Sequence, residues 1–249
     1  MHKIVIMGAG RMGSLIRRLA EAARDEAGSP VFEVVAQIGF DLTELEGAPA
    51  ADALIDFSNV ATFEAVAAYV RRCGCALVSG TTGYSEAQMA ELRALGEGAP
   101  VLWSGNYSLG VAALRHLVAQ ATRELPAFDV EIVETHHNQK ADAPSGTAKM
   151  LLDEVVGAHE AAGDGAYAPV YGRYGMCGAR DAREVGVHAL RGGTVAGVHE
   201  VHFFGPSEEL TLTHRAESRE IFVHGALAAA QKLIGRDPGF YTFDQIMFG

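Results

Sequence analysis

The sequence has few cysteines and no long apolar run. Its 249 residues contain three cysteines, an odd number that is too small for the disulfide framework of a secreted domain. Cys73 and Cys75 lack a second pair, so we expect idle thiols in a reducing cytoplasm rather than a zinc site. No apolar stretch of about 18 residues occurs, so no transmembrane helix is predicted. The N-terminus reaches Gly8 too early for a secretory leader.

Basic residues are also scarce. Lys and Arg number 20 against 31 Asp and Glu, which gives a formal net charge of −11. This balance argues against nucleic acid or an anionic membrane as the main partner. Any site for an anion must therefore be built locally. With 49% apolar and 20% charged residues, the chain has a globular composition and is long enough for one to two domains.

The first hundred residues alternate short apolar runs with amphipathic stretches. We expect strands at residues 4–7, 31–38, 53–57, 76–79 and 101–103. We expect helices at residues 12–27, 59–72 and 85–95. This rhythm predicts an α/β domain of the Rossmann type, with a parallel sheet between two layers of helices.

The rhythm changes after Asn106. We expect helices at residues 109–125, 146–156 and 219–234, strands at 130–136, 184–191, 197–204 and 209–216, and a long loop at 163–183. The hairpin-like spacing predicts a second, α+β domain with a mixed or antiparallel sheet. We place the dinucleotide-binding domain at residues 1–107 plus 217–249, and a domain for substrate binding and oligomerisation at residues 108–216.

A complete G-x-G-x-x-G motif follows the first expected strand and opens the first expected helix. In this context the first Gly turns the chain, the second lets the backbone approach a pyrophosphate, and the third lets the helix pack on the sheet. The helix N-terminus adds unpaired N–H groups for the phosphates. The residues of this loop are Gly8, Ala9, Gly10, Arg11, Met12 and Gly13.

The region after the second expected strand bears on the choice of cofactor. Asp41 is the nearest candidate for the ribose hydroxyls, although it lies 28 residues past Gly13, later than the usual spacing of about 20. A solvated loop acid is the alternative. Residues 36–52 contain four acids and no Lys or Arg, so a 2′-phosphate would meet only negative charge. We therefore expect NADH to be preferred and NADPH to bind more weakly.

Two later loops follow the fourth and fifth expected strands. Small and hydroxyl residues at the carboxyl ends of parallel strands line the ligand crevice of such sheets, although simple turn chemistry also explains them. The candidate cofactor-binding residues are Gly80, Thr81, Thr82, Ser104, Gly105, Asn106 and Tyr107.

Residues 134–148, Glu-Thr-His-His-Asn-Gln-Lys-Ala-Asp-Ala-Pro-Ser-Gly-Thr-Ala, are the most informative segment. Ser145 is a candidate helix N-cap, so Gly146 and Thr147 offer N–H groups to an anion. Lys140 adds a cation, and histidine suits proton transfer near neutral pH. These residues predict a carboxylate pocket beside a proton donor. Structural histidines with a solvated lysine are the alternative.

His136 and His137 also raise the question of a metal. Adjacent residues on a strand point to opposite faces, and no further His or carboxylate follows at ligand spacing. We expect no metal site.

Both motifs together resemble the dihydrodipicolinate reductase family, and the resemblance covers nearly the whole chain. The most specific matching segment is residues 134–148. Further matching segments are residues 8–13, 55–58, 80–83, 106–110, 191–193, 199–200 and 213–219.

The resemblance implies a homotetrameric cytoplasmic enzyme of lysine and diaminopimelate biosynthesis. Hydride from NAD(P)H would reduce a cyclic unsaturated imine dicarboxylate, 4-hydroxy-tetrahydrodipicolinate, to tetrahydrodipicolinate. It implies that His136 or Lys140 supplies the proton, and which of the two does so stays open. The implied substrate-binding residues are His137, Lys140, Ser145, Gly146, Thr147 and Arg219.

The glycine loop is one residue shorter than in many members of that family, and an acid-then-Arg pair after the second strand is missing. These departures support the preference for NADH. Two other hypotheses remain: another two-domain amino-acid or semialdehyde dehydrogenase, which would not need residues 136–147, and a non-catalytic dinucleotide sensor, which would bind NADH without turnover.

Overall fold

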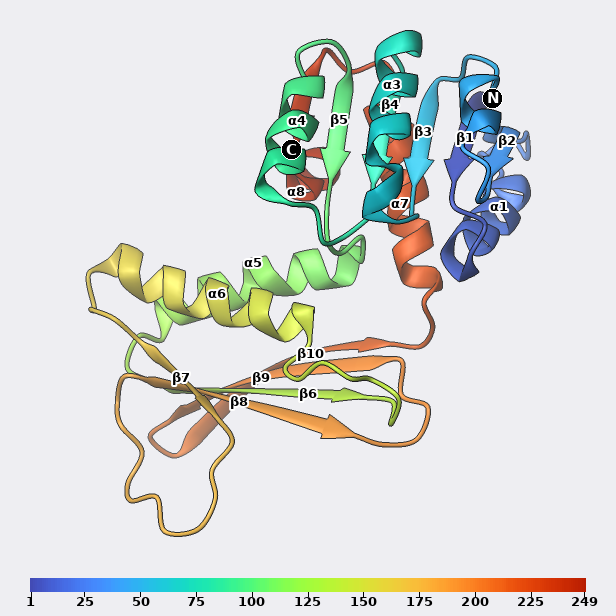
Figure 1. Ribbon diagram of the computed structural model, residues 1–249. Coiled ribbons are helices and arrows are strands. Elements are labelled where there is room, and N and C mark those ends of the chain that lie inside the picture. Colours follow the sequence, from blue (N-terminus) through green and yellow to red (C-terminus); the bar gives the residue numbers. More distant parts are fainter. The chain divides into compact units, whose positions relative to one another are not determined.

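The computed structural model describes residues 1–249 and divides into two compact units (Figure 1). Unit 1 comprises Met1–Leu109 and Glu220–Gly249, and unit 2 comprises Gly110–Arg219. The expected fold class is confirmed, because unit 1 contains a parallel sheet and unit 2 a mixed one. None of the helices combines the length and apolar character needed to cross a bilayer.

Unit 1 is built on a six-stranded sheet with the order β11-β5-β4-β3-β1-β2, in which every pair is parallel. The strands are β1 (His2–Met7), β2 (Phe32–Ile38), β3 (Ala53–Asp56), β4 (Ala76–Ser79), β5 (Pro100–Trp103) and β11 (Gly239–Tyr241). The helices are α1 (Arg11–Ala22), α2 (Thr43–Glu46), η1 (Val60–Thr62), α3 (Phe63–Cys73), α4 (Glu86–Leu95), α7 (Glu220–Leu233) and α8 (Phe243–Phe248).

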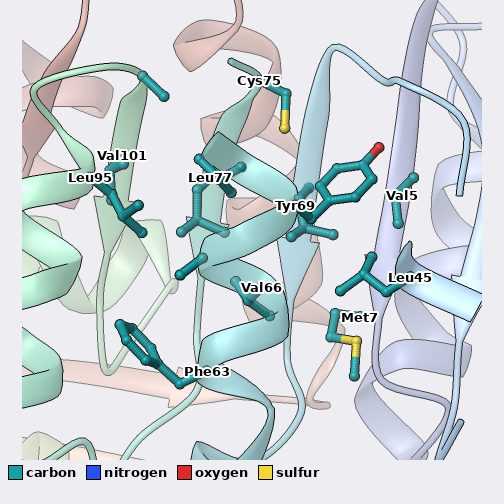
Figure 2. Close-up of a cluster of buried hydrophobic side chains, with 14 of the residues drawn as sticks. Val5, Met7, Leu45, Phe63, Val66, Tyr69, Cys75, Leu77, Leu95 and Val101 are labelled. Atoms are coloured by element: carbon teal, nitrogen blue, oxygen red, sulfur yellow. The ribbon is translucent and has the colours of Figure 1, made fainter. Parts of the chain in front are cut away.

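The central strands of unit 1 are apolar on both faces because helices cover both faces. Figure 1 shows α3 and α4 on one side of the sheet and α7 on the other. Every residue of β3 and β4 is buried, as expected for interior parallel strands. Figure 2 shows one of the resulting layers, in which Phe63, Val66 and Tyr69 of α3 face Leu77 and neighbouring strand residues. Burying one such side chain contributes about 1.5–3 kcal/mol.

Unit 2 contains a five-stranded sheet with the order β10-β9-β6-β8-β7. Its elements are α5 (Leu109–Glu124), β6 (Asp129–His136), α6 (Gly146–Ala162), β7 (Ala168–Tyr171), β8 (Glu184–Arg191), β9 (Gly197–Gly205) and β10 (Glu208–Ala216). Strand β6 runs parallel to β8 and antiparallel to β9. Helices α5 and α6 pack on one face of this sheet, around Ile132 and Phe203. Leu190 and Phe204 remain 49% and 41% exposed.

Three expectations about local structure were wrong. Residues 163–183 are not one loop, because β7 forms at the edge of the sheet, where Pro169 is tolerated without a partner for its nitrogen. The helix at 219–234 is not the last element, since β11 and α8 follow it. Helix α1 ends at Ala22, five residues before the expected end, and the chain from Ala23 turns back through an Arg24–Pro30 bridge.

Two arginines fasten the loop at 172–183 to the sheet of unit 2. Glu131 accepts hydrogen bonds from Arg173 Nη1 (3.0 Å), Arg180 Nε (3.1 Å) and His188 Nε2 (2.6 Å). Burial alone would raise the pKa of Glu131, but these hydrogen bonds outweigh it and lower the pKa to about 2. The loop is therefore held by a carboxylate that stays ionised in dilute acid.

We expect acid to remove the stabilisation that Glu131 provides. Its pKa in the folded state is lower than its ordinary value of 4.5, so the stabilisation is complete above that value and is lost as the pH falls toward about 2. Urea unfolding of the wild type and Glu131→Gln should differ at about pH 6, differ less at about pH 3, and converge only as the pH approaches about 2. A difference in unfolding midpoint that does not depend on pH would contradict this.

Candidate functional site

The glycine motif of unit 1 forms a tight loop between β1 and α1. Gly8 has a φ of +118°, and a Cβ there would lie 2.7 Å from the carbonyl oxygen of Phe57. A Cβ on Gly13 would lie 1.9 Å from the carbonyl oxygen of Gly8. Gly10 is the N-cap of α1, and nothing lies within 4 Å of its Cβ position. The loop thus needs Gly8 and Gly13 for its own packing, whereas Gly10 leaves open space at the helix N-terminus.

A cavity of about 340 Å³ adjoins this loop and connects it with the ends of β3 and β4. Its lining residues are Met12, Phe57, Ser58, Asn59, Val60, Gly80, Thr81 and Thr82. Met12 and residues 80–82 were predicted as cofactor contacts from the sequence, whereas residues 57–60 were not. Their position after a central strand was the signal that could have found them. Gly80 and the Phe57 ring pack closely in the wall of this cavity, because a Cβ on Gly80 would lie 2.4 Å from the ring.

A buried carboxylate holds the two strand ends beside this cavity. Asp56, the last residue of β3, is fully buried. It accepts hydrogen bonds from Ser58 Oγ, from Ser79 Oγ (3.0 Å) and from Tyr84 Oη (3.1 Å). Ser79 ends β4, and Tyr84 follows the loop at 80–83. Asp56 therefore fixes the cavity wall, although no role was predicted for it.

The loop after β5 lies against the loop after β4. Trp103 Nε1 donates to the carbonyl oxygen of Thr81 (2.9 Å), and Tyr107 Oη donates to that of Ser79 (2.7 Å). Ser104 Oγ donates to the carbonyl oxygen of Asn106 (2.6 Å). Tyr107 is 1% exposed, so its side chain acts in packing, and contact with a cofactor stays a prediction.

Asp41 lies two residues before the short helix α2, and its carboxylate binds the first residue of that helix. Its Oδ1 accepts from Thr43 Oγ1 (2.6 Å) and from the Thr43 backbone N–H (3.0 Å). The Thr43 hydroxyl and N–H together hold the pKa of Asp41 below its usual range. The carboxylate is exposed and ionised, and its contact with a ribose stays a prediction.

Unit 2 gathers the chemistry-bearing residues of its informative segment on the helix-covered face of the sheet. Glu134 and His136 share one face of β6, because they are two residues apart. In the sheet register Glu134 lies opposite His199 of β9, and His136 lies opposite Arg191 of β8. His136 Nδ1 lies 2.6 Å from Glu134 Oε2, and the His136 and His199 rings meet edge to face with centroids 5.2 Å apart.

The N-terminus of α6 is joined to this group through Ser145. The Ser145 N–H donates to Glu134 Oε1 (3.0 Å), and Ser145 Oγ accepts from the Ala148 N–H (3.2 Å) as the expected N-cap. Ser145 Oγ also lies 3.0 Å from His199 Nε2. Gly146 and Thr147 form the first turn of α6, so their N–H groups lie at the positive end of a 17-residue helix.

Lys140 lies in the loop between β6 and α6. Its Nζ forms an ion pair with both carboxylate oxygens of Asp142, at 2.7 and 2.9 Å, and the side chain is 20% exposed. Arg191 Nη2 donates to the backbone oxygen of Asp142 (2.6 Å), which ties this loop to the sheet. The ammonium group of Lys140 is therefore held near the end of β6 and still reaches solvent.

The remaining predicted substrate-binding residues are His137 and Arg219. His137 is half-buried, and its backbone N–H donates to the carbonyl oxygen of Val195 (2.8 Å). Arg219 is exposed at the boundary of unit 2. No group of three His, Cys, Asp or Glu side chains is arranged to hold a metal ion. Glu134, Arg191 and His199 had no predicted role, and the structure places all three in one cluster with His136.

The charges of this cluster are set by its contacts. Burial would raise the pKa of Glu134, but hydrogen bonds from Arg191 and His136 outweigh it and place the pKa below its usual range. Burial lowers the pKa of His199 to about 4, and the charge of His136 acts in the same direction. At neutral pH the cluster therefore contains an ionised Glu134 and a neutral His199. Together with Lys140 and the α6 N-terminus, it can bind a carboxylate and exchange a proton.

Comparison with known proteins decides the family. Residues 2–107 match the family model described as "Dihydrodipicolinate reductase, N-terminus", and residues 110–247 match "Dihydrodipicolinate reductase, C-terminus". The chain belongs to the dihydrodipicolinate reductase family. A 4-hydroxy-tetrahydrodipicolinate reductase from Caldanaerobacter subterraneus subsp. tengcongensis is 38% identical, with 99% of this chain and 98% of the relative covered. One from Staphylococcus aureus strain MSSA476 is also 38% identical, covering 98% of this chain and all of the relative.

Solved structures agree with the fold. A dipicolinate-bound dihydrodipicolinate reductase from Paenisporosarcina sp. TG-14 covers 100% of both chains at 20% identity, with a TM-score of 0.76. An amine dehydrogenase from Mycobacterium smegmatis covers 98% of this chain and 95% of its own, at 13% identity, with a TM-score of 0.60. At these identities the likeness concerns the fold alone. The second match shows that members of other dehydrogenase families share it.

Proposed function

We propose that this protein is an NAD(P)H-dependent 4-hydroxy-tetrahydrodipicolinate reductase of lysine biosynthesis. The observation that carries the proposal is membership in the dihydrodipicolinate reductase family over both halves of the chain. A carboxylate cradle beside two groups able to transfer protons, in unit 2, supports it. Membership in this family also favours the proposal over another dehydrogenase or a sensor without turnover.

Unit 1 has the residues to hold the dinucleotide. A Cβ would fill the loop at Gly8 and Gly13, and the N–H groups at the start of α1 suit a pyrophosphate. The nicotinamide cofactor supplies the hydride. The loop at 8–13, residues 80–82 and residues 104–107 are the proposed contacts, together with the cavity wall at 57–60.

Unit 2 has the residues to hold the dicarboxylate. We assign the first-turn N–H groups of Gly146 and Thr147, capped by Ser145, to one carboxylate of the substrate, with Lys140 and His137 beside it. Arg219 is a further proposed contact. Reduction of the conjugated ring leaves negative charge that a proton from Lys140 or His136 neutralises. General acid catalysis of this kind contributes about 10²- to 10⁴-fold.

The proposal is tested by supplying the substrate as it forms. Dihydrodipicolinate synthase makes it in situ, and loss of NADH absorbance on adding this protein measures the reduction. Turnover that depends on the synthase is the expected result. NADH binding without oxidation would overturn the proposal in favour of a sensor.

We expect a lower Michaelis constant for NADH than for NADPH. The chain after β2 carries Asp41, Glu44 and Glu46 without a basic residue, so the 2′-phosphate of NADPH would be placed among like charges. Repulsion at a distance of several ångströms is worth about 1 kcal/mol in water, which corresponds to roughly fivefold. Initial rates with both cofactors at low salt measure the ratio. A lower constant for NADPH would reject the preference.

We also propose a homotetramer. The face of the unit 2 sheet opposite α5 and α6 leaves Leu190 and Phe204 exposed at 49% and 41%, which is compatible with burial against another copy. Light scattering on the purified protein measures the mass. A monomeric mass at micromolar concentration would overturn this part of the proposal.

A further inference from the structure

The Glu134 carboxylate is fully buried and surrounded by donors. Its Oε2 accepts from Arg191 Nη1 (2.8 Å) and lies 2.6 Å from His136 Nδ1. Its Oε1 accepts from Arg191 Nη2 (2.8 Å) and from the Ser145 N–H (3.0 Å). An ionised carboxylate accepts hydrogen bonds only. Every group that faces Glu134 must therefore present a hydrogen, and this includes Nδ1 of His136.

This requirement determines how His136 can exchange a proton. With Nδ1 carrying a hydrogen, the neutral ring has its lone pair on Nε2, and Nε2 is the atom that gains or loses a proton. Nε2 lies close to the backbone of Gly197, because a Cβ built on Gly197 would be 3.1 Å from it. We propose that Glu134, held by Arg191, is a positioning residue that fixes the His136 tautomer so that Nε2 is the proton-transfer atom. The inference rests on the proposed reductase function.

Arg191 has two tasks in this arrangement. A buried carboxylate without a cation would be costly, and the bidentate guanidinium supplies that charge in the geometry that suits a carboxylate best. The same side chain donates to the backbone oxygen of Asp142, whose carboxylate holds Lys140. Arg191 thus connects the two groups that are proposed to supply the proton.

The variant Glu134→Gln tests the tautomer directly. The Ser145 N–H is an obligatory donor, so the amide oxygen of Gln must take the Oε1 position and its NH₂ the Oε2 position. The NH₂ then faces two donors of the wild type, Nδ1 of His136 and Nη1 of Arg191. The guanidinium of Arg191 stays protonated, so His136 is the group that can accept from the NH₂, and it does so by giving up its Nδ1 hydrogen. We expect the hydrogen to move to Nε2. In a Ser-His-Asp catalytic triad, replacing the Asp that orients the histidine by Asn leaves the wrong tautomer and lowers kcat by about 10⁴-fold. We expect kcat of Glu134→Gln to fall by at least about 10²-fold.

The protonation of the two imidazole nitrogens of His136 can be measured directly. It would not change if Glu134 served only to stabilise the fold. Proton–nitrogen correlation spectra of protein labelled with ¹⁵N-histidine distinguish a protonated Nδ1 from a protonated Nε2, and the His136 signals are assigned by their absence in His136→Gln. We expect the Nδ1–H tautomer in the wild type at alkaline pH and the Nε2–H tautomer in Glu134→Gln. The same tautomer in both proteins would overturn the inference.

A double-mutant cycle separates this inference from the proposed function. If Glu134 acts through His136, Glu134→Gln should cost less than about 3-fold in kcat once His136 is Gln. An undiminished loss in that background overturns the inference while leaving the reductase function intact. Wild-type turnover by His136→Gln would remove the role of His136 and the inference together. Absence of any NADH oxidation by the wild type would instead overturn the function.

Glu131→Gln is the matched control. Like Glu134, Glu131 lies on β6 and binds arginine and histidine, in this case two arginines and His188. It has no place in the proposed site. We expect its kcat to stay within about 2-fold of the wild type. A loss equal to that of Glu134→Gln would overturn the inference, since it would show that any broken acid–histidine cluster in this sheet lowers turnover.

Discussion

Replacing Lys140 by Ala should lower kcat by about 10²-fold or more, while the dissociation constant for NADH changes less than about 2-fold. The ammonium group of Lys140 lies in unit 2, held by Asp142 near the end of β6, whereas the glycine loop and the cavity beside it belong to unit 1. Loss of the side chain removes a proton donor and a cation for a carboxylate. It leaves the cofactor contacts unchanged.

The single tryptophan makes both quantities measurable on one sample. Trp103 ends β5, and its indole N–H binds the Thr81 carbonyl at the cavity wall, so quenching of its emission should report NADH binding. Lys149→Ala is the matched control, because Lys149 is an exposed lysine on α6 in the same unit. Wild-type kcat in Lys140→Ala would refute its proposed role. An equal loss in Lys149→Ala would point to a general charge effect.

Alanine at Gly13 and alanine at Gly10 should have opposite consequences. At Gly13 the new Cβ would lie 1.9 Å from the Gly8 carbonyl oxygen, and this backbone atom cannot move aside as the end of a flexible side chain could. Overpacking of this kind costs about 1–3 kcal/mol or more, which exceeds the gain of about 1 kcal/mol from placing Ala rather than Gly in a helix. We expect the ligand-free protein to lose that stability.

At Gly10 the new Cβ meets no protein atom within 4 Å, so the ligand-free protein should lose less than about 1 kcal/mol, the usual effect at an N-cap. The open space at Gly10 is where the pyrophosphate would approach, so we expect NADH affinity to fall at least about tenfold, or about 1.4 kcal/mol. Thermal unfolding without ligand and Trp103 quenching measure the two effects. Unchanged NADH affinity in Gly10→Ala would place the pyrophosphate elsewhere.

The fold class could be predicted because it depends on local patterns. Buried parallel strands read as short apolar runs, and residues 4–7, 53–57 and 76–79 were recognised in this way. Strand β7 was missed because Pro169 interrupts the short apolar stretch Ala168-Pro169-Val170-Tyr171, and a proline argues against a strand. This strand forms because its backbone pairs with the edge of β8. Strand β11, only three residues long, likewise depends on pairing with β5.

The sequence allowed a candidate site to be proposed where the residues are adjacent in the chain, and it did not reveal the neighbours that the sheet brings to them. Residues 136–147 stand in one segment and were recognised as a unit. Arg191 lies 57 residues from Glu134, and their contact follows from the register of β6 against β8. No periodicity in the sequence encodes that register. The buried Asp56 cluster shows the same limit, because Ser79 and Asp56 are joined only once β3 and β4 pair.

The course of the chain through the two units sets the order in which they can fold during synthesis. Unit 2 is one continuous segment, Gly110–Arg219, whereas unit 1 needs Glu220–Gly249 for α7, β11 and α8. Helix α7 alone contributes buried side chains such as Val223 and Leu233. On the ribosome, unit 2 can complete its sheet while unit 1 still exposes an unpaired β5 edge and the side of β3, β4 and β5 that α7 later covers. The nucleotide-binding half, although translated first, is thus completed last and depends longest on protection from aggregation.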